Sequence, residues 1–224
     1  MQGTLVNAAA VLVGSGLGLA LGSRLPERMR EVVLQGLGLA SLAIGFHLTL
    51  KTDRLVVVIG SLLLGGLCGE ALQIERALER GGAWVRDRVG SRSKTFVHGF
   101  ITASLVYCVG AMTVVGALEE GISGDPSILY AKSALDGFAS IAFAASLGVG
   151  VAFAAGTVLV VQGALTLLGT QLKFLLEPPV LNVLSATGGL LIVGIGFYLL
   201  GIKRLRVANL LPALIFAPAL ATFF

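Results

Sequence analysis

Lys132 and Asp136 are the two side chains whose types and spacing could do chemistry in this sequence. They are four residues apart, so a helix would place the ammonium and the carboxylate on one face, within pairing distance. They open an apolar run, and a charged pair at lipid depth is costly enough to mark a functional site by default. The alternative is that Lys132 extends to the headgroup level and keeps Asp136 as its partner. We interpret Asp136 as an ion or proton site, or as the counter-charge to Lys132.

Other polar side chains in apolar runs could line a polar cavity around this pair. Each must find a partner or face water, because unsatisfied polar groups in hydrocarbon are expensive. For a single Asn or Gln, an interhelical hydrogen bond is the more common explanation. The candidate substrate- or ion-binding residues are Asp136, Lys132, Asn7, Gln162, Ser104 and Asn182. The wider polar set adds Gln35, Glu70, Thr102, Thr113 and Asn209.

The composition is that of a membrane protein. Hydrophobic residues make up 56% of the chain and charged residues 12%, whereas soluble domains carry about 25% charged residues. The net charge of +4 could suggest nucleic acid. The basic residues, however, stand in short breaks between apolar runs, as the positive-inside bias predicts. Cys68 and Cys108 lie inside apolar runs and are interpreted as small core residues, and we expect no metal, cofactor or nucleic-acid partner.

Eight apolar stretches approach the length needed to cross a bilayer as helices, about 17–25 residues. A boundary is placed at Gly148-Val149-Gly150 because the run 129–170 is too long for one helix; one span plus a re-entrant helix is the alternative. Pro212 and Pro218 are expected to bend or unwind the last helix. The predicted spans are 5–21, 32–50, 55–72, 96–118, 130–147, 149–170, 180–200 and 207–223.

The basic residues also predict the orientation of these spans. With eight spans and the N-terminus outside, the inner loops hold 12 of the 16 Lys and Arg, from Arg24 onward; a single span over 129–170 leaves 10 inside. The most polar segment, 73–94, interleaves arginines with apolar residues and Trp84, as an amphipathic helix on the cytoplasmic surface does. The whole chain, 1–224, is then one integral membrane domain containing this segment.

Two parts of the chain resemble each other. Segments 42–48 and 193–199 each precede a short basic turn and another apolar span, so spans 1–3 repeat as spans 6–8 in the opposite orientation. Spans 4 and 5, the central pair, also resemble each other: residues 98–100 of span 4 are similar to residues 136–138 of span 5. Inverted repeats with Gly or Pro interruptions are typical of secondary transporters, whose sites lie near the midplane. The alternative is that Gly- and Leu-rich segments resemble each other by composition alone.

Four motifs carry a resemblance to a known family: 3–7, 103–112, 132–138 and Gln162-Gly163. Together they are similar to the bacterial family typified by YqgA and YdfK, integral membrane proteins of unassigned function that are often described as possible transporters. The resemblance covers essentially the whole chain. It implies a multi-pass helical fold in the bacterial inner membrane, and it implies no substrate.

The sequence therefore predicts an all-α transmembrane bundle that moves a small polar or ionic solute across the bilayer. No P-loop, nucleophile elbow or His-Glu-x-x-His motif is present, and we expect no enzyme. One alternative is a structural or regulatory membrane protein with a dry core and a partner bound by the basic 73–94 helix. Another is an ion channel. The glycine-rich helix faces also make a homodimer plausible.

Overall fold

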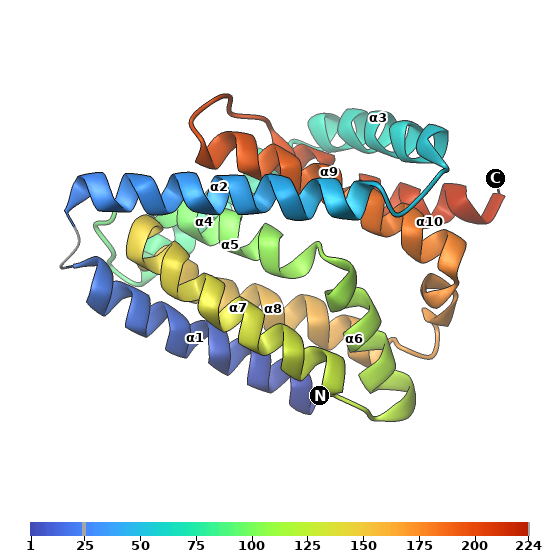
Figure 1. Cartoon of the computed structure of the whole chain (residues 1–224), viewed down its shortest axis with the longest axis horizontal. Coiled ribbons are helices and arrows are strands. Elements are labelled where there is room, and N and C mark those ends of the chain that lie inside the picture. The colour runs from blue at the N-terminus through green and yellow to red at the C-terminus, as the bar shows by residue number, and fades with distance from the viewer. Residues whose placement is uncertain (24–25, 224) are drawn as a thin grey trace. The chain divides into compact units, whose positions relative to one another are not determined.

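The computed structural model describes residues 1–23 and 26–223, and within them the chain is helical and has no strand (Figure 1). Arg24, counted in the orientation analysis, lies outside the described residues. The α-helices are α1 (Gln2–Gly22), α2 (Glu27–Thr49), α3 (Leu55–Ala71), α4 (Ile74–Arg88), α5 (Phe96–Cys108), α6 (Ala111–Ser123), α7 (Ser127–Leu147), α8 (Gly150–Leu167), α9 (Pro178–Leu199) and α10 (Ala213–Phe223). Two short 3₁₀ helices, η1 (Lys173–Leu176) and η2 (Val207–Leu210), flank α9.

Five described helices are long and apolar enough to cross a membrane: α1, α2, α7, α8 and α9. Two further candidates are bent pairs, α3 with α4 at 57° and α5 with α6 at 59°. If each bent pair counts as one span, the number rises to seven. The all-helical membrane fold predicted from the sequence is therefore confirmed at this coarser level.

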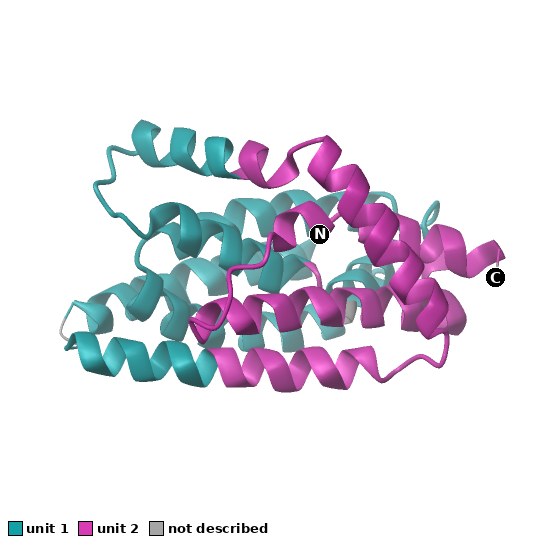
Figure 2. Ribbon diagram, turned by 90° about the horizontal axis from the view of Figure 1, so that it is seen from above, with its two compact units in different colours: residues 1–37, 79–108, 112–172 teal, residues 38–78, 109–111, 173–224 magenta. Residues whose placement is uncertain are grey.

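The described helices group into two compact units (Figure 2). Unit 1 comprises residues 1–37, 79–108 and 112–172, and unit 2 comprises residues 38–78, 109–111 and 173–224. Unit 1 therefore holds α1, α5, α7, α8 and nearly all of α6, whereas unit 2 holds α3, α9, α10 and the second half of α2.

Within unit 1, α1 and α7 run parallel in close contact. A Cβ atom at Gly3 would lie 2.6 Å from Leu129 Cβ, at the start of both helices. A Cβ atom at Gly22 would lie 2.7 Å from Ala145 Cα, at the end of both. Glycine at these positions lets the two backbones approach, as in many membrane helix pairs. The glycines of α1 thus serve its contact with α7.

Two other helices of unit 1 run in the opposite direction. α5 is antiparallel to α7, because Tyr107 near the end of α5 contacts Ser140, while Gly99 near its start faces Leu147 at the end of α7. α8 is parallel to α5, since the tilted rings of Phe96 and Phe153 pack with centroids 5.2 Å apart and Ser104, later in α5, bonds to Thr157, later in α8. It follows that α8 is antiparallel to α1, against which it also packs.

Unit 2 is built from two antiparallel pairs. In the first, Gly45 of α2 meets Gly189 of α9, where a Cβ on Gly45 would be 2.6 Å from the Gly189 carbonyl oxygen. Seven residues earlier in α2, Gly38 lies beside Gly196, and a Cβ on Gly38 would be 3.3 Å from the Gly196 carbonyl oxygen. In the second pair, α3 packs antiparallel to η2 and α10. Backbone proximity at glycines is again the packing principle.

The predicted break between spans 5 and 6 is confirmed. α7 ends at Leu147 and α8 begins at Gly150. Between them Gly148 has φ +83°, a conformation that side chains with a Cβ rarely adopt. The run 129–170 is therefore two helices joined by a glycine turn.

The structure differs from the sequence prediction at span 4. Residues 96–118 were expected to form one uninterrupted helix, but α5 ends at Cys108 and α6 begins after Val109 and Gly110. Glycine has low helix propensity, and Thr113 Oγ1 donates to the Tyr107 carbonyl oxygen at 2.8 Å. This bond satisfies a carbonyl group that the break would otherwise leave without a helical partner.

The last predicted span is also interrupted, as the two prolines suggested. Residues 207–210 form η2, and α10 begins only after Pro212, which lacks the N–H that a continuous helix would need. Pro218 lies inside α10. With 11 residues, α10 is shorter than the roughly 20 residues that cross a bilayer. An uninterrupted helix over 207–223 is therefore not what the chain forms.

The polar segment 73–94 is helical over Ile74–Arg88 as α4. Gln73, with φ +52°, marks the bend where α3 gives way to α4. On α4 the apolar residues Ile74, Leu78 and Val85 are half-buried, whereas Trp84 is 67% exposed. A helix with one covered apolar stripe and an exposed aromatic side chain among arginines fits an interfacial position.

Candidate functional site

Lys132 and Asp136 form an ion pair one helical turn apart on α7. Both side chains are almost fully buried in unit 1, at 6% and 10% exposure. Removing two such charges from water costs several kcal/mol per ion, and that cost is offset only by close pairing and additional hydrogen bonds. The charges are therefore held inside the protein, and Lys132 does not extend to its surface.

A second donor reaches the same carboxylate oxygen from α1. Asn7 Nδ2 donates to Asp136 Oδ2 at 3.0 Å, and Asn7 is fully buried. The contact depends on the close approach of α1 and α7, because a short Asn side chain spans the gap only where the backbones are near. Asp136 thus accepts from a charged donor on its own helix and from a neutral donor on α1. Asn7 and Asp136 are 129 residues apart in sequence.

The end of α5 completes the surroundings of the pair. Tyr107, fully buried, shares a hydrogen bond of 2.8 Å with Ser140, which stands one turn after Asp136 on α7. The end of α5 is therefore held against the turn of α7 that follows Asp136.

The remaining predicted site residues are distributed more widely. Ser104 faces α8 and donates to Thr157 Oγ1 at 2.9 Å. Gln162 of α8 is fully buried, and neither of its side-chain polar atoms has a partner. Asn182 is half-buried on α9 and belongs to unit 2, whereas the other candidates belong to unit 1. The structure thus brings Lys132, Asp136 and Asn7 into direct contact.

Sequence reasoning missed Tyr107, Ser140 and Glu120 as members of the polar interior. A tyrosine inside an apolar run is a usable signal, because a buried phenol requires a hydrogen-bond partner. Glu120 falls between the predicted spans 96–118 and 130–147. It is buried at 6% exposure near the end of α6.

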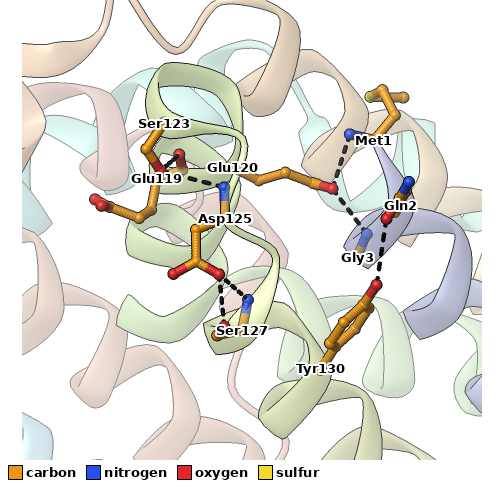
Figure 3. A network of polar contacts seen from close by, with 9 residues as sticks. All are labelled: Met1, Gln2, Gly3, Glu119, Glu120, Ser123, Asp125, Ser127 and Tyr130. Atoms are coloured by element: carbon orange, nitrogen blue, oxygen red, sulfur yellow. Dashed lines mark hydrogen bonds and ion pairs between the residues drawn. The ribbon is translucent and has the colours of Figure 1, made fainter.

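Glu120 connects α6 to the first turn of α1 (Figure 3). Its Oε1 lies 2.8 Å from the Met1 amino nitrogen and accepts from Gly3 N at 2.8 Å. An acidic group at a helix N-terminus is stabilised by the unpaired N–H groups there. The contact fixes the end of α6 against α1.

The turn between α6 and α7 is stabilised locally (Figure 3). Asp125 Oδ1 accepts from the backbone N–H of Ser127 at 3.0 Å and from its hydroxyl at 2.5 Å. These two bonds lower the pKa of the exposed Asp125 carboxyl. Nearby, the Tyr130 hydroxyl donates to Gln2 Oε1 at 3.4 Å. Both features position the start of α7, which carries Lys132.

A second polar cluster lies in unit 2, around Asn209. Asn209 Nδ2 donates to Glu70 Oε2 at 2.7 Å, and Asn209 Oδ1 accepts from Glu75 N at 2.7 Å. Arg206 Nη1 pairs with the other oxygen of Glu70 at 2.7 Å. One buried amide therefore holds both sides of the bend between α3 and α4.

Replacing this amide is expected to loosen the bend. Asn209→Ala removes two hydrogen bonds and leaves the backbone N–H of Glu75 without its acceptor, so we expect a loss of about 1–2 kcal/mol in unfolding free energy. Arg206→Gln, at an exposed ion pair, should have a smaller effect. Thermal unfolding of the two purified variants in detergent measures the difference. Equal losses would contradict the role given to Asn209.

The described residues contain no group of three or more His, Cys, Asp or Glu that could hold a metal ion. Cys68 and Cys108 are free thiols, each half-buried. The Asp136 carboxylate thus accepts from the Lys132 ammonium and the Asn7 amide, and the Tyr107–Ser140 hydroxyl pair lies one turn further along α7. Such a set of groups can bind and release a proton, a cation or a small polar solute.

Comparisons with known proteins find uncharacterised relatives that extend over nearly the whole chain. The uncharacterized protein YqgA of Escherichia coli (strain K12) is 37% identical over 224 residues, covering 98% of this chain and 95% of the relative. The uncharacterized membrane protein YdfK of Bacillus subtilis (strain 168) is 29% identical over 223 residues, covering 97% of this chain and 94% of that protein. No solved structure matches. Residues 2–222 match the family described as "Protein of unknown function (DUF554)", and the chain belongs to that family of membrane proteins.

Proposed function

We propose that the protein is a secondary transporter of a small polar or ionic solute in the bacterial inner membrane. The observation that carries the proposal is the buried Lys132–Asp136 pair on an apolar helix long enough to cross the bilayer. Ionisable groups at such depth are expensive and mark ion or substrate pathways. Asp136 would bind the solute or a coupling ion, and Lys132 with Asn7 would hold the carboxylate in place.

The interrupted helix beside the pair supports the same function. Transporter sites are commonly formed where a membrane helix is discontinuous, because the exposed backbone groups of the break can contact a ligand. α5 ends at Cys108, one residue after Tyr107, whose hydroxyl bonds to Ser140 on α7, and the chain turns by 59° before α6. Irregular backbone at this depth is tolerated where it is buried in protein or lines a cavity. The ion pair and the Tyr107 end of α5, both in unit 1, form the proposed binding region.

An inverted repeat is the architectural part of the proposal. The repeat predicted from the sequence aligns Gly38 with Gly189 and Gly45 with Gly196, both 151 residues apart. The contacts of unit 2 join Gly45 to Gly189 and Gly38 to Gly196. A two-fold axis that maps Gly45 onto Gly196 also maps Gly189 onto Gly38. It therefore maps the first contact onto the second, as an inverted repeat requires. The antiparallel direction of α1 against α8, and of α3 against α10, agrees with the same relation.

Eight spans with the N-terminus outside remain the proposed topology. The directions within unit 1 fit it, because α1 and α7 would run inward and α5 and α8 outward. In this topology η2 and α10 act as an interrupted eighth segment. The alternatives are a channel and a structural protein with a dry core. The buried ionic pair favours a solute-binding protein over a dry core, since apolar residues of the same volume are often equally stable in a purely structural position.

Uptake by purified protein in liposomes tests the proposal. The panel consists of ions, amino acids and carboxylates, each offered with and without a proton or sodium gradient. We expect saturable uptake of at least one solute, dependent on a gradient, and no uptake in protein-free liposomes. Uptake that fails to saturate and ignores the gradient would instead indicate a channel. No uptake of any solute would leave the dry-core alternative as the better description.

A further inference from the structure

Unit 1 contains a second group of buried polar atoms beside the ion pair. Gln162 and Thr4 are fully buried, at 0% exposure. Thr4 Oγ1 and both side-chain polar atoms of Gln162 have no hydrogen-bond partner. Asn7 Oδ1 and Thr166 Oγ1 are unpartnered as well. An unpaired buried polar group costs a few kcal/mol, and native proteins satisfy nearly all of them. Four such residues in one region point to a ligand.

The four residues lie on two helices that face each other. Gln162 and Thr166 are one turn apart on α8, and Thr4 and Asn7 are one turn apart on α1, so each pair shares a helix face. α8 is antiparallel to α1, which brings the end of α8 to the start of α1. A Cβ at Gly163 would lie 3.4 Å from Met1 Cε. The turn containing Gln162 is therefore beside the first turns of α1.

The end of α6 closes the same region. Glu120 Oε1 accepts from Gly3 N at 2.8 Å, next to Thr4 (Figure 3). The following residue, Gly121, packs against the backbone carbonyl oxygen of Thr166. Polar groups of α1, α6 and α8 thus meet at one end of unit 1, and Glu120 contributes a negative charge there.

The chemistry of this region favours a cation. Asn7 already uses its amide nitrogen on Asp136, so its oxygen is the free atom. Gln162 adds an amide oxygen, and two threonines add hydroxyl oxygens. Neutral oxygens suit a hard cation. Glu120 Oε2 is also buried and without a partner, but the charge of this carboxylate is already paired with the Met1 amine. The region therefore lacks the free carboxylate charge that divalent ions usually require. An anion would find few donors here and would face Glu120.

We propose that Thr4, Asn7, Gln162 and Thr166 bind a monovalent hard cation, with Na⁺ as the best candidate. Asn7 joins this cation to the ion pair, because its oxygen contacts the cation while its nitrogen holds Asp136. Binding at either place therefore favours the arrangement of Asn7 needed at the other, and the coupling is reciprocal. In the transporter proposed above the cation would drive uptake, but its binding does not require that function.

Cation-dependent thermal unfolding of the purified full chain in detergent tests this site. Titrations with NaCl, LiCl and KCl are compared with choline chloride at one fixed total salt concentration. A ligand that binds only the folded state raises Tm in a saturable manner. We expect Na⁺ to raise Tm of the wild type, and binding of radioactive ²²Na⁺ to saturate over the same range. Identical curves for all four salts would overturn the proposal.

Matched variants locate the site. Gln162→Leu and Thr166→Val are expected to weaken apparent Na⁺ affinity at least 10-fold. Ser15→Ala is the control, because Ser15 Oγ is equally buried and unpartnered on α1 but lies three turns away from Thr4. It should keep the wild-type affinity. Because Gln162 has no protein partner, Gln162→Leu should be as stable as the wild type in choline chloride.

Gln162→Glu separates the loss of a cation ligand from a general effect of changing residue 162. Gln162→Glu keeps one oxygen ligand and adds charge, so Na⁺ affinity should be retained or increased. Na⁺ binding that survives Gln162→Leu, or that is lost equally in Ser15→Ala, would show that the ion binds elsewhere. Na⁺ binding together with no uptake of any solute would refute the transporter and leave the cation site standing. Solute uptake without Na⁺ binding would refute the cation site and support the transporter.

Discussion

Asp136→Asn is expected to reduce solute uptake to the background of empty liposomes while the protein stays folded. The substitution removes the charge that would bind the solute or coupling ion but keeps an oxygen that can accept from Lys132 and Asn7. Some loss of stability is expected, because breaking a buried pair leaves an uncompensated charge at a cost of up to about 3–5 kcal/mol. Uptake is therefore measured alongside thermal unfolding and gel filtration of the same preparation.

A double variant separates a functional from a structural role of the pair. Lys132→Met with Asp136→Leu removes both charges and fills the space with apolar atoms, which for buried pairs is often neutral or stabilising. If the pair serves transport, this variant is stable and inactive. If the pair has only a structural role, the same variant is stable and active. Normal uptake by Asp136→Asn, or by the double variant, would remove Asp136 from the transport site.

The helices could be predicted from the sequence because each signal is local. Apolar runs separated by polar breaks predicted six of the eight segments as single helices, within a few residues at each end for most of them. The Gly-Val-Gly turn at 148–150 could also be recognised, because the run around it exceeded the length of one helix. The charged pair was equally visible, since Lys132 and Asp136 are separated by one turn of a single helix.

The break after Cys108 could not be predicted in the same way. Gly110 stands in an apolar run of acceptable length, and this chain has 31 glycines, most of which lie inside helices. What distinguishes Gly110 is tertiary: the neighbouring Val109 carbonyl packs on Gly188 of α9, and Thr113 caps the freed Tyr107 carbonyl group. The contacts of Asn7 with Asp136, and of Glu120 with Gly3, likewise join residues more than 100 positions apart. Only the folded chain brings such partners together.

Glycine contacts between α2 and α9 provide the second large prediction. Gly45→Ala would place a Cβ 2.6 Å from the Gly189 carbonyl oxygen, and Gly189→Ala would place one 2.6 Å from the Gly45 carbonyl oxygen. Backbone atoms cannot move aside as a flexible side chain can, so the helices must separate. We expect each substitution to lower the unfolding free energy by about 3 kcal/mol, near the top of the usual range for overpacking. Thermal or denaturant unfolding in detergent measures it.

Gly36→Ala is the matched control, and we expect it to raise the unfolding free energy. Gly36 lies two residues before Gly38 on the same helix and has no heavy atom within 4 Å of its Cβ position. Gly36→Ala should therefore stabilise the protein by about 0.5–1 kcal/mol, through the higher helix propensity of alanine. If Gly45→Ala and Gly36→Ala have the same effect, α2 and α9 do not meet at these glycines.

The same substitutions test the inverted repeat, because the repeat makes Gly196 the counterpart of Gly45. A Cβ at Gly196 would lie 2.8 Å from Leu42 Cδ2 and 3.0 Å from the Gly38 carbonyl oxygen. Side-chain atoms of Leu42 can shift but the carbonyl oxygen cannot, so Gly196→Ala should destabilise the protein nearly as much as Gly45→Ala. A Gly196→Ala protein as stable as Gly36→Ala would mean that the two glycines are not equivalent. The resemblance between the two halves would then be one of composition, and the transporter proposal would lose its architectural support.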